Sequence, residues 1–78
     1  MMRETELSAC VRHALEEYFK DLDGQAPHAV YDMLIHCIEK PLLESVMHRA
    51  SGNQSKAAEI LGLNRNTLRK KLKLHNIP

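Results

Sequence analysis

The fold is decided by the stretch Gly52–Leu74, which reads GNQSKAAEILGLNRNTLRKKLKL. Asn53 or Ser55 can accept hydrogen bonds from the first amides of a short helix that starts there. Gly62 stands where a left-handed residue is needed to end that helix and turn the chain. Asn64 then suits the N-cap of a second helix. The stretch therefore predicts a helix-turn-helix.

Both predicted helices have a side suited to packing. The first spans roughly residues 55 to 61, and its small residues Ala57 and Ala58 let the second helix approach closely. In the second helix, Leu68 and Leu72 are four residues apart and form one buried stripe. This pattern predicts that the second helix rests on the first and exposes its other face.

That exposed face is polar and basic. Arg65 and Thr67 occupy the first turn of the second helix, the part of a recognition helix that reaches furthest into a DNA major groove. Asn66, Lys70 and Lys73 lie on the side opposite the leucines, whereas Lys71 lies nearer the buried side.

Charge is distributed unevenly along the chain. Residues 1 to 51 hold five Lys or Arg against nine acids, a net charge of −4, and residues 52 to 78 hold six against Glu59 alone, a net charge of +5. The formal total of +1 therefore hides a strongly basic end, as expected of a surface that binds phosphates. The alternative is a protein-interaction module whose basic C-terminal helix binds an acidic partner.

The same stretch resembles the DNA-binding region of the Fis family, the bacterial factors for inversion stimulation, and the last domain of NtrC-type activators. The shared pattern is GNxxxAAxxLGxNRxTLRKKL, and YFKDLDGQ and EKPLLESVM extend the resemblance to Fis from about Leu7 to the C-terminus. It implies a free-standing, homodimeric protein that binds and bends DNA, regulates transcription and associates with the bacterial nucleoid. Sequence specificity would be loose.

Residue roles follow from position and from this resemblance. Arg65 is expected to make a bidentate contact to guanine, with Asn64 and Arg69 beside it at base edges. Asn66 replaces a glycine of the best-known Fis pattern and can add a contact, whereas Leu74 stands where the family often has a lysine. Phosphates are expected to be held by Gln54, Ser55, Thr67, Lys70 and Lys73, which position the helix without reading sequence. The complete predicted DNA-binding set is Asn53, Gln54, Ser55, Asn64, Arg65, Asn66, Thr67, Arg69, Lys70 and Lys73.

Two longer helices are predicted upstream. Apolar residues recur every three or four positions from Leu7 to Leu22, and Gly24 suits the end of that helix. The second spans about residues 29 to 50, with Pro41 producing a kink and no break. It is apolar on more than one side, which a single neighbour cannot cover. A dimeric four-helix core is therefore expected. The predicted dimerisation residues are Val11, Leu15, Phe19, Leu34, Ile38, Leu42 and Val46.

Other classes of function find little support in the sequence. Cys10 and Cys37 lie among apolar residues and are interpreted as buried hydrophobes in a reducing cytoplasm. The five histidines are scattered, and Cys10 with His13 supplies only half of a tetrahedral metal site. No phosphate-binding glycine loop, activated nucleophile or membrane span is present. We expect neither enzyme activity nor a small-molecule substrate, metal or cofactor.

The sequence as a whole predicts an all-α fold with four helices. Residues 1–51 would form a helical dimerisation region and residues 52–78 a helix-turn-helix DNA-binding region, within one compact domain. Residues 1 to about 6 are polar and expected to be frayed. They are also too few for the β-hairpin arm with which Fis proteins contact a recombinase, so stimulation of DNA inversion is not expected.

Overall fold

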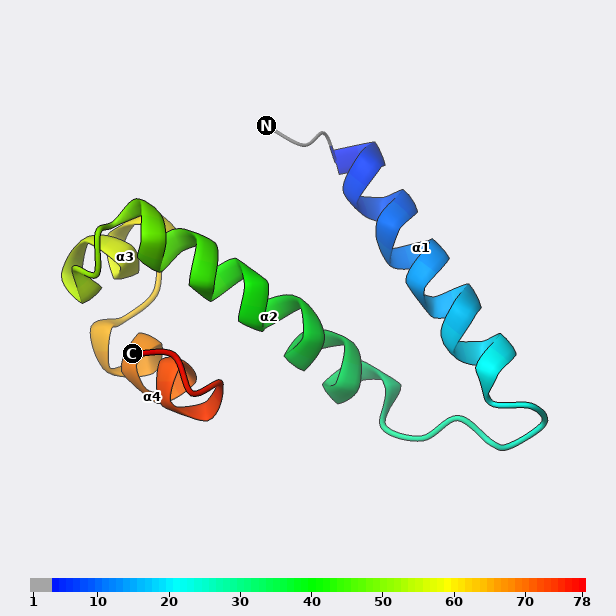
Figure 1. The fold of residues 1–78 in the computed structure, drawn as a ribbon. Coiled ribbons are helices and arrows are strands. Elements are labelled where there is room, and N and C mark those ends of the chain that lie inside the picture. The colour runs from blue at the N-terminus through cyan, green and yellow to red at the C-terminus, as the bar shows by residue number, and fades with distance from the viewer. Residues whose placement is uncertain (1–3) are drawn as a thin grey trace. The chain divides into compact units, whose positions relative to one another are not determined.

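The computed structural model describes residues 4 to 78, and this part of the chain contains helices and no strand. The helices are α1 (Glu4–Asp21), α2 (Val30–Arg49), α3 (Gln54–Leu61) and α4 (Arg65–Leu74), as Figure 1 shows. The predictions of an all-α fold and of four helices are confirmed. By contacts, the chain divides into two compact units with a boundary between Val30 and Tyr31. The functional division at residue 51 stays a prediction.

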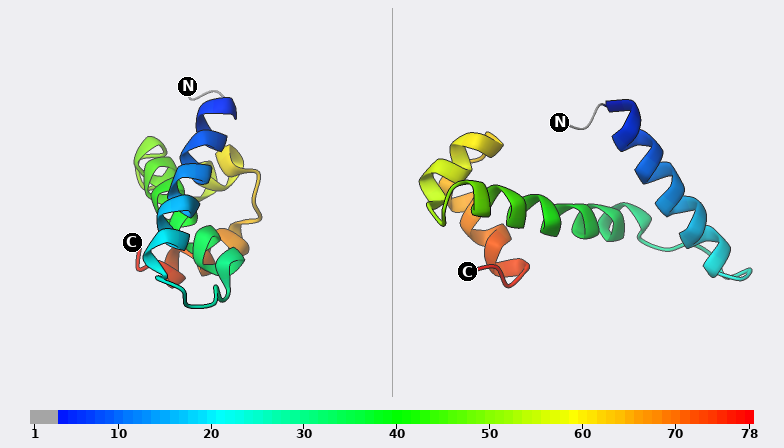
Figure 2. Two further views of the ribbon diagram at one scale, coloured as in Figure 1. Left: turned by 90° about the vertical axis from the view of Figure 1, so that its right-hand side faces the viewer. Right: turned by 45° about the horizontal axis from the view of Figure 1, so that its top comes forward.

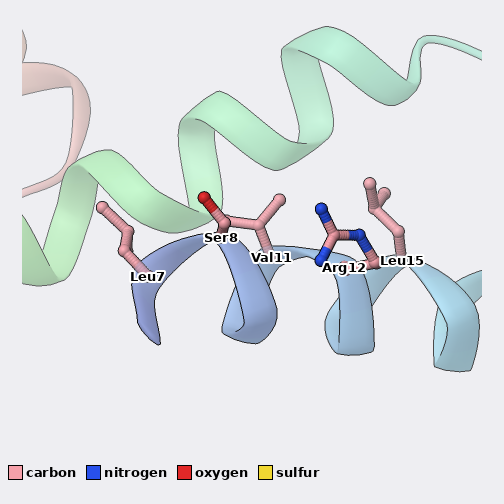
Figure 3. Close-up of a pocket in the computed structure, with 5 residues that line it drawn as sticks. All are labelled: Leu7, Ser8, Val11, Arg12 and Leu15. Atoms are coloured by element: carbon pink, nitrogen blue, oxygen red, sulfur yellow. The ribbon is translucent and has the colours of Figure 1, made fainter. Parts of the chain in front are cut away.

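The N-terminal unit is built on α1. Residues 4 to 6 were expected to be frayed, but α1 already begins at Glu4, so the expectation is wrong for these residues. The same expectation for residues 1 to 3 lies outside the described residues. The expectation that no hairpin arm precedes α1 also concerns these three residues. Leu7, Val11 and Leu15 are four residues apart and line a hollow along one side of α1 (Figure 3).

The second helix, α2, runs without interruption from Val30 to Arg49 and contains Pro41 within it. The prediction that Pro41 does not divide this segment into two helices is therefore confirmed. Only the C-terminal part of α2 is deeply buried in this chain, through Leu43 and Met47. In Figure 1 and in the right-hand view of Figure 2, α3 and α4 lie beside this end of α2, in agreement with the buried cluster that they share.

The core of the C-terminal unit is small and aliphatic. Leu68 and Leu72 of α4 are 0% and 2% exposed, and the predicted buried stripe is confirmed. They pack with residues from the end of α2 and from α3. The small side chains of Ala57 and Ala58 on α3 allow α4 to approach closely. The buried cluster comprises Leu43, Met47, Ala50, Ala57, Ala58, Leu68 and Leu72, with Val46, Leu61 and Ile77 partly buried against it.

Three helices of this unit end in the same way. In each, a backbone amide donates to the carbonyl five residues earlier: Gly52 to Met47, Leu63 to Ala58, and Ile77 to Leu72, at 2.8–3.0 Å. The chain turns through left-handed residues at these points, among them Gly62, which has φ 73° as predicted. Ser51 and Asn76 adopt positive φ without being glycine.

The interpretation of the cysteines as buried residues is wrong for this chain. Cys10 and Cys37 are both exposed and free, although each has apolar neighbours in the sequence. An apolar helical stripe buries its members only where another element covers it, so apolar neighbours in the sequence do not by themselves predict burial. None of the described helices is long and apolar enough to cross a bilayer.

Burial of Leu68 should account for much of the stability of the C-terminal unit. Leu68→Ala removes a side chain with no exposed surface, and we expect a loss of about 2–5 kcal/mol in the free energy of unfolding. Leu74→Ala is the matched control, since the same change on the same helix affects a side chain that is 62% exposed. Chemical denaturation at one protein concentration measures both variants. Equal losses would contradict the proposed core.

Candidate nucleic-acid interface

Side-chain caps define where α3 and α4 begin. Asn53 Oδ1 accepts a hydrogen bond from the Lys56 amide at 3.1 Å, so Asn53 and not Ser55 is the N-cap of α3. The helix consequently starts at Gln54, one residue earlier than expected. Asn64 Oδ1 accepts from the Asn66 amide at 2.8 Å and caps α4, as predicted. Only residues 62 to 64 separate the two helices, so their geometry is tightly constrained.

One side-chain hydrogen bond joins the starts of the two helices on the solvent side. Arg65 is the first residue of α4, and its Nη1 donates to Ser55 Oγ at 3.0 Å. Ser55 is the second residue of α3. The structure therefore brings together two predicted DNA-binding residues that are ten positions apart in the sequence.

The other predicted DNA-binding residues also lie at the surface. Leu68 and Leu72 face the core, and Arg69 and Lys70, which lie between them on α4, face solvent. Gln54 is half-buried, and the exposed members of the predicted set are Asn53, Ser55, Asn64, Arg65, Asn66, Thr67, Arg69, Lys70 and Lys73. They include the four cations Arg65, Arg69, Lys70 and Lys73 on a single helix of ten residues.

Lys71 differs from the other cations of α4. Its Nζ lies 2.7 Å from Glu39 Oε2 on α2, which agrees with its predicted place nearer the buried side. The second oxygen of the same carboxylate, Oε1, lies 2.9 Å from His75 Nε2. Glu39 therefore connects the C-terminal end of α4 to α2 through Lys71 and His75. The ammonium group of Lys71 is paired with Glu39 and does not belong to the exposed basic face.

The ionised state of the Glu39 carboxylate determines which ring nitrogen of His75 carries a hydrogen. The hydrogen bond from Lys71 lowers the pKa of Glu39 below its ordinary value, and the bond with His75 lowers it further. Because an ionised carboxylate only accepts hydrogen bonds, His75 Nε2 must carry the donated hydrogen. The His75 side chain is fully buried, and within residues 4 to 78 its Nδ1 meets no hydrogen-bond partner. Its ring lies 4.4 Å from that of His36, centroid to centroid.

Sequence reasoning missed the role of His75. A signal was present: His75 follows Leu68 by seven residues and Leu72 by three, which places it on the buried face of α4. Its partner Glu39 lies 36 residues away, and no spacing rule links two such distant positions. The described residues contain no group of three or more His, Cys, Asp or Glu suited to holding a metal ion.

A short helix, a three-residue turn and a second helix with a buried leucine stripe and a basic outer face make a helix-turn-helix. Motifs of this class place the second helix in the major groove and cross the DNA backbone with the first. The exposed face of α4 is therefore a candidate nucleic-acid interface.

Comparisons with known proteins agree with this class. The family model of bacterial regulatory proteins of the Fis family matches residues 36–74. A protein of Neisseria meningitidis serogroup A described as a Fis-like DNA-binding protein is 60% identical over 72 residues, covering 92% of this chain and 91% of its own length. The chain belongs to the Fis family.

Two further relatives show how far the similarity extends. One from Ralstonia nicotianae, also described as Fis-like and DNA-binding, is 54% identical over 76 residues, or 97% of this chain and 99% of the relative. The DNA-binding protein Fis of Glaesserella parasuis is 46% identical over 67 residues, or 86% of this chain and 68% of the relative. The similarity thus includes the N-terminal unit as well as the helix-turn-helix.

The Glu39 contact should make stability depend on pH. The folded-state pKa of Glu39 lies below its ordinary value of 4.5, so its contribution is present above that value and is lost as pH falls through the folded-state pKa. Glu39→Gln should therefore cost about 1–2 kcal/mol at neutral pH. The difference from the unmodified chain should shrink as pH falls below 4.5.

Chemical denaturation across this pH range, at constant protein concentration, measures the effect. Glu44→Gln is the control because Glu44 is an exposed carboxylate on the same helix. A Glu39→Gln difference that is constant across pH would contradict a role for the ionised carboxylate.

Proposed function

We propose that this chain is a homodimeric DNA-binding and DNA-bending protein of the Fis type. It would act in the bacterial cytoplasm as a nucleoid-associated transcriptional regulator with loose sequence specificity. The observation that carries the proposal is the basic, exposed face of α4, which begins with Arg65 bonded to Ser55. The relatives described as DNA-binding support the same function.

The charge on this face suits a phosphate backbone. Once Lys71 is assigned to Glu39, the cations left at the surface of residues 52 to 78 are Lys56, Arg65, Arg69, Lys70 and Lys73. Glu59 is the one acid in that part of the sequence. A duplex that contacts several of these cations releases counterions, so its affinity should fall steeply as salt rises.

The proposed roles divide between base reading and positioning. Arg65 would make a bidentate contact to guanine N7 and O6. Asn64 and Arg69 would approach neighbouring base edges. Because the Oδ1 of Asn64 is used as the helix cap, its Nδ2 donors are the atoms that remain for a base. Phosphates would be held by Gln54, Ser55, Thr67, Lys70 and Lys73, with Asn53 and Asn66 adding contacts at the two helix starts.

Arg65 and Lys73 provide a test of these roles. Arg65→Ala should weaken binding to a preferred site by about 1–3 kcal/mol and relax the preference at the contacted base. Lys73→Ala should weaken binding to all duplexes alike and reduce the salt slope by about one. Titration of labelled preferred and random duplexes over a range of salt concentrations measures both. An unchanged preference after Arg65→Ala would overturn the assignment of the base-reading residue.

The same titration distinguishes the alternative function. If the basic face binds an acidic protein partner, short duplexes should bind weakly and without preference among sequences. A preference between duplexes of equal length and charge cannot arise from net charge alone, so it would favour DNA as the partner.

Dimerisation is supported by apolar side chains that the chain leaves uncovered. Ile38 and Leu42 on α2 are 38% and 48% exposed, and Phe19 on α1 is 48% exposed. The other predicted dimerisation residues, Val11, Leu15, Leu34 and Val46, are half-buried. Val46 also packs against the core of the helix-turn-helix. Chains this short have small cores, and association of two copies would add the missing burial.

A dimer predicts that the melting temperature rises with protein concentration. Leu42→Glu should dissociate or unfold the protein, because it places a charge in the proposed interface while leaving the core of the C-terminal unit untouched. Ile60→Glu is the control, since Ile60 is also an exposed apolar residue but lies outside the predicted dimerisation set. Sedimentation and thermal melts provide the measurements. A concentration-independent melt of a folded monomer would overturn the dimer.

DNA bending follows from the family resemblance and from geometry. In Fis the two recognition helices of the dimer are closer together than one turn of B-DNA, so the duplex must bend and narrow its central minor groove. Preferred sites should therefore have A·T-rich centres that the protein does not touch. Exchanging the centre of a good site for G·C, with the flanks kept, should reduce affinity in a gel-shift titration. Equal affinities would exclude this reading of DNA shape.

A further inference from the structure

The hydrogen bond between Arg65 and Ser55 suggests a role for the serine beyond that of a phosphate contact. Arg65 Nη1 donates to Ser55 Oγ at 3.0 Å, so the serine oxygen acts as an acceptor. A hydroxyl has two acceptor lone pairs and one hydrogen to donate. Ser55 therefore keeps its own O–H available while it holds the guanidinium.

The placement of the two residues favours this contact. Arg65 begins α4, and side chains on a helix lean toward its N-terminus, so the Arg65 side chain extends toward α3 and not along α4. Ser55 stands in the first turn of α3, next to the cap made by Asn53. Both ends of the hydrogen bond thus start from capped, well-defined helix termini.

A side chain that bridges an arginine and a DNA phosphate must accept a hydrogen bond from one and donate a hydrogen bond to the other. A guanidinium only donates hydrogen bonds, and a phosphate only accepts them. A hydroxyl is able to accept from the first and donate to the second at the same time. Ser55 lies on the solvent side of α3, the helix that crosses the backbone in this class of motif.

We propose that Ser55 is a positioning residue for Arg65: its hydroxyl accepts from the guanidinium and donates to a backbone phosphate. In this arrangement Ser55 contributes to specificity without contacting a base. Its hydroxyl orders the long side chain of Arg65 before DNA binds, which lowers the entropy lost when Arg65 contacts guanine. The inference rests on the proposed function and refines it. It gives Ser55 a part in base reading, which a phosphate contact alone would not have.

Three variants test the role. Ser55→Ala removes the hydroxyl, Ser55→Thr keeps it, and Ser45→Ala is the control because it removes an exposed hydroxyl from a helix outside the motif. Circular dichroism checks that each protein remains folded. Affinities for a preferred and a random duplex are then measured for each variant, alone and combined with Arg65→Ala.

We expect Ser55→Ala to lower the preferred-to-random affinity ratio about threefold to tenfold, the effect of one hydrogen bond. Ser55→Thr should restore the ratio, and Ser45→Ala should leave it unchanged. In the Arg65→Ala background, Ser55→Ala should no longer alter the ratio. If Ser55→Ala weakens both duplexes by one factor, or changes neither, the positioning role is overturned.

A measurement without DNA provides an independent test. The Nε–Hε group of Arg65 can be followed by ¹⁵N NMR relaxation in the free protein. Ser55→Ala should make this group more mobile, whereas Ser55→Thr should leave it as ordered as in the unmodified chain. Equal mobility in all three proteins would overturn the inference. Failure of the unmodified chain to bind either duplex at low salt would instead overturn the proposed function, so the two failures are distinguishable.

Discussion

The C-terminal unit depends on burial of Leu68 and Leu72 against the end of α2 and the small residues of α3. These two leucines determine which side of α4 faces inward, and the outward side follows from the 3.6-residue period of a helix. Because Ala57 and Ala58 present almost no side chain, α4 packs close to α3 and the starts of the two helices meet. The outward orientation of the basic side chains of α4 is thus a consequence of leucine burial on the other side of the same helix.

Glu39 supports this arrangement from outside the motif. Its carboxylate binds Lys71 and His75, which lie four residues apart at the C-terminal end of α4. In addition to leucine burial, these two hydrogen bonds to one carboxylate connect the C-terminal end of α4 to α2. The same contact neutralises one lysine of the NRNTLRKKLKL segment, so the run of basic residues in the sequence overstates the charge available for a ligand.

Local features of the sequence predicted the local features of the structure. The cap at Asn64, the left-handed turn at Gly62 and the inward position of Leu68 each depend on residues within one or two helical turns, and each is confirmed. The Glu39–His75 contact was not predicted, since it joins residues 36 positions apart. The cysteines were assigned wrongly for a related reason: a stripe of apolar residues indicates an amphipathic helix, but not which element covers it. The roles of Asn53 and Ser55 were left open because either side chain can cap a helix, and the structure assigns the cap to Asn53.

The connections between α2, α3 and α4 have a consequence for how chains of this type can vary. Residues 50 to 53, 62 and 63 take part in helix-ending hydrogen bonds, with left-handed backbone at Ser51, Gly52 and Gly62, and Asn64 caps the next helix. An inserted or deleted residue would disrupt these hydrogen bonds and turns, which align the apolar stripe of the following helix with the core. We therefore expect a change in the length of either connection to destabilise the motif. Exchange of exposed side chains on α4 instead changes the groups offered to a ligand and leaves the backbone of the motif unaltered.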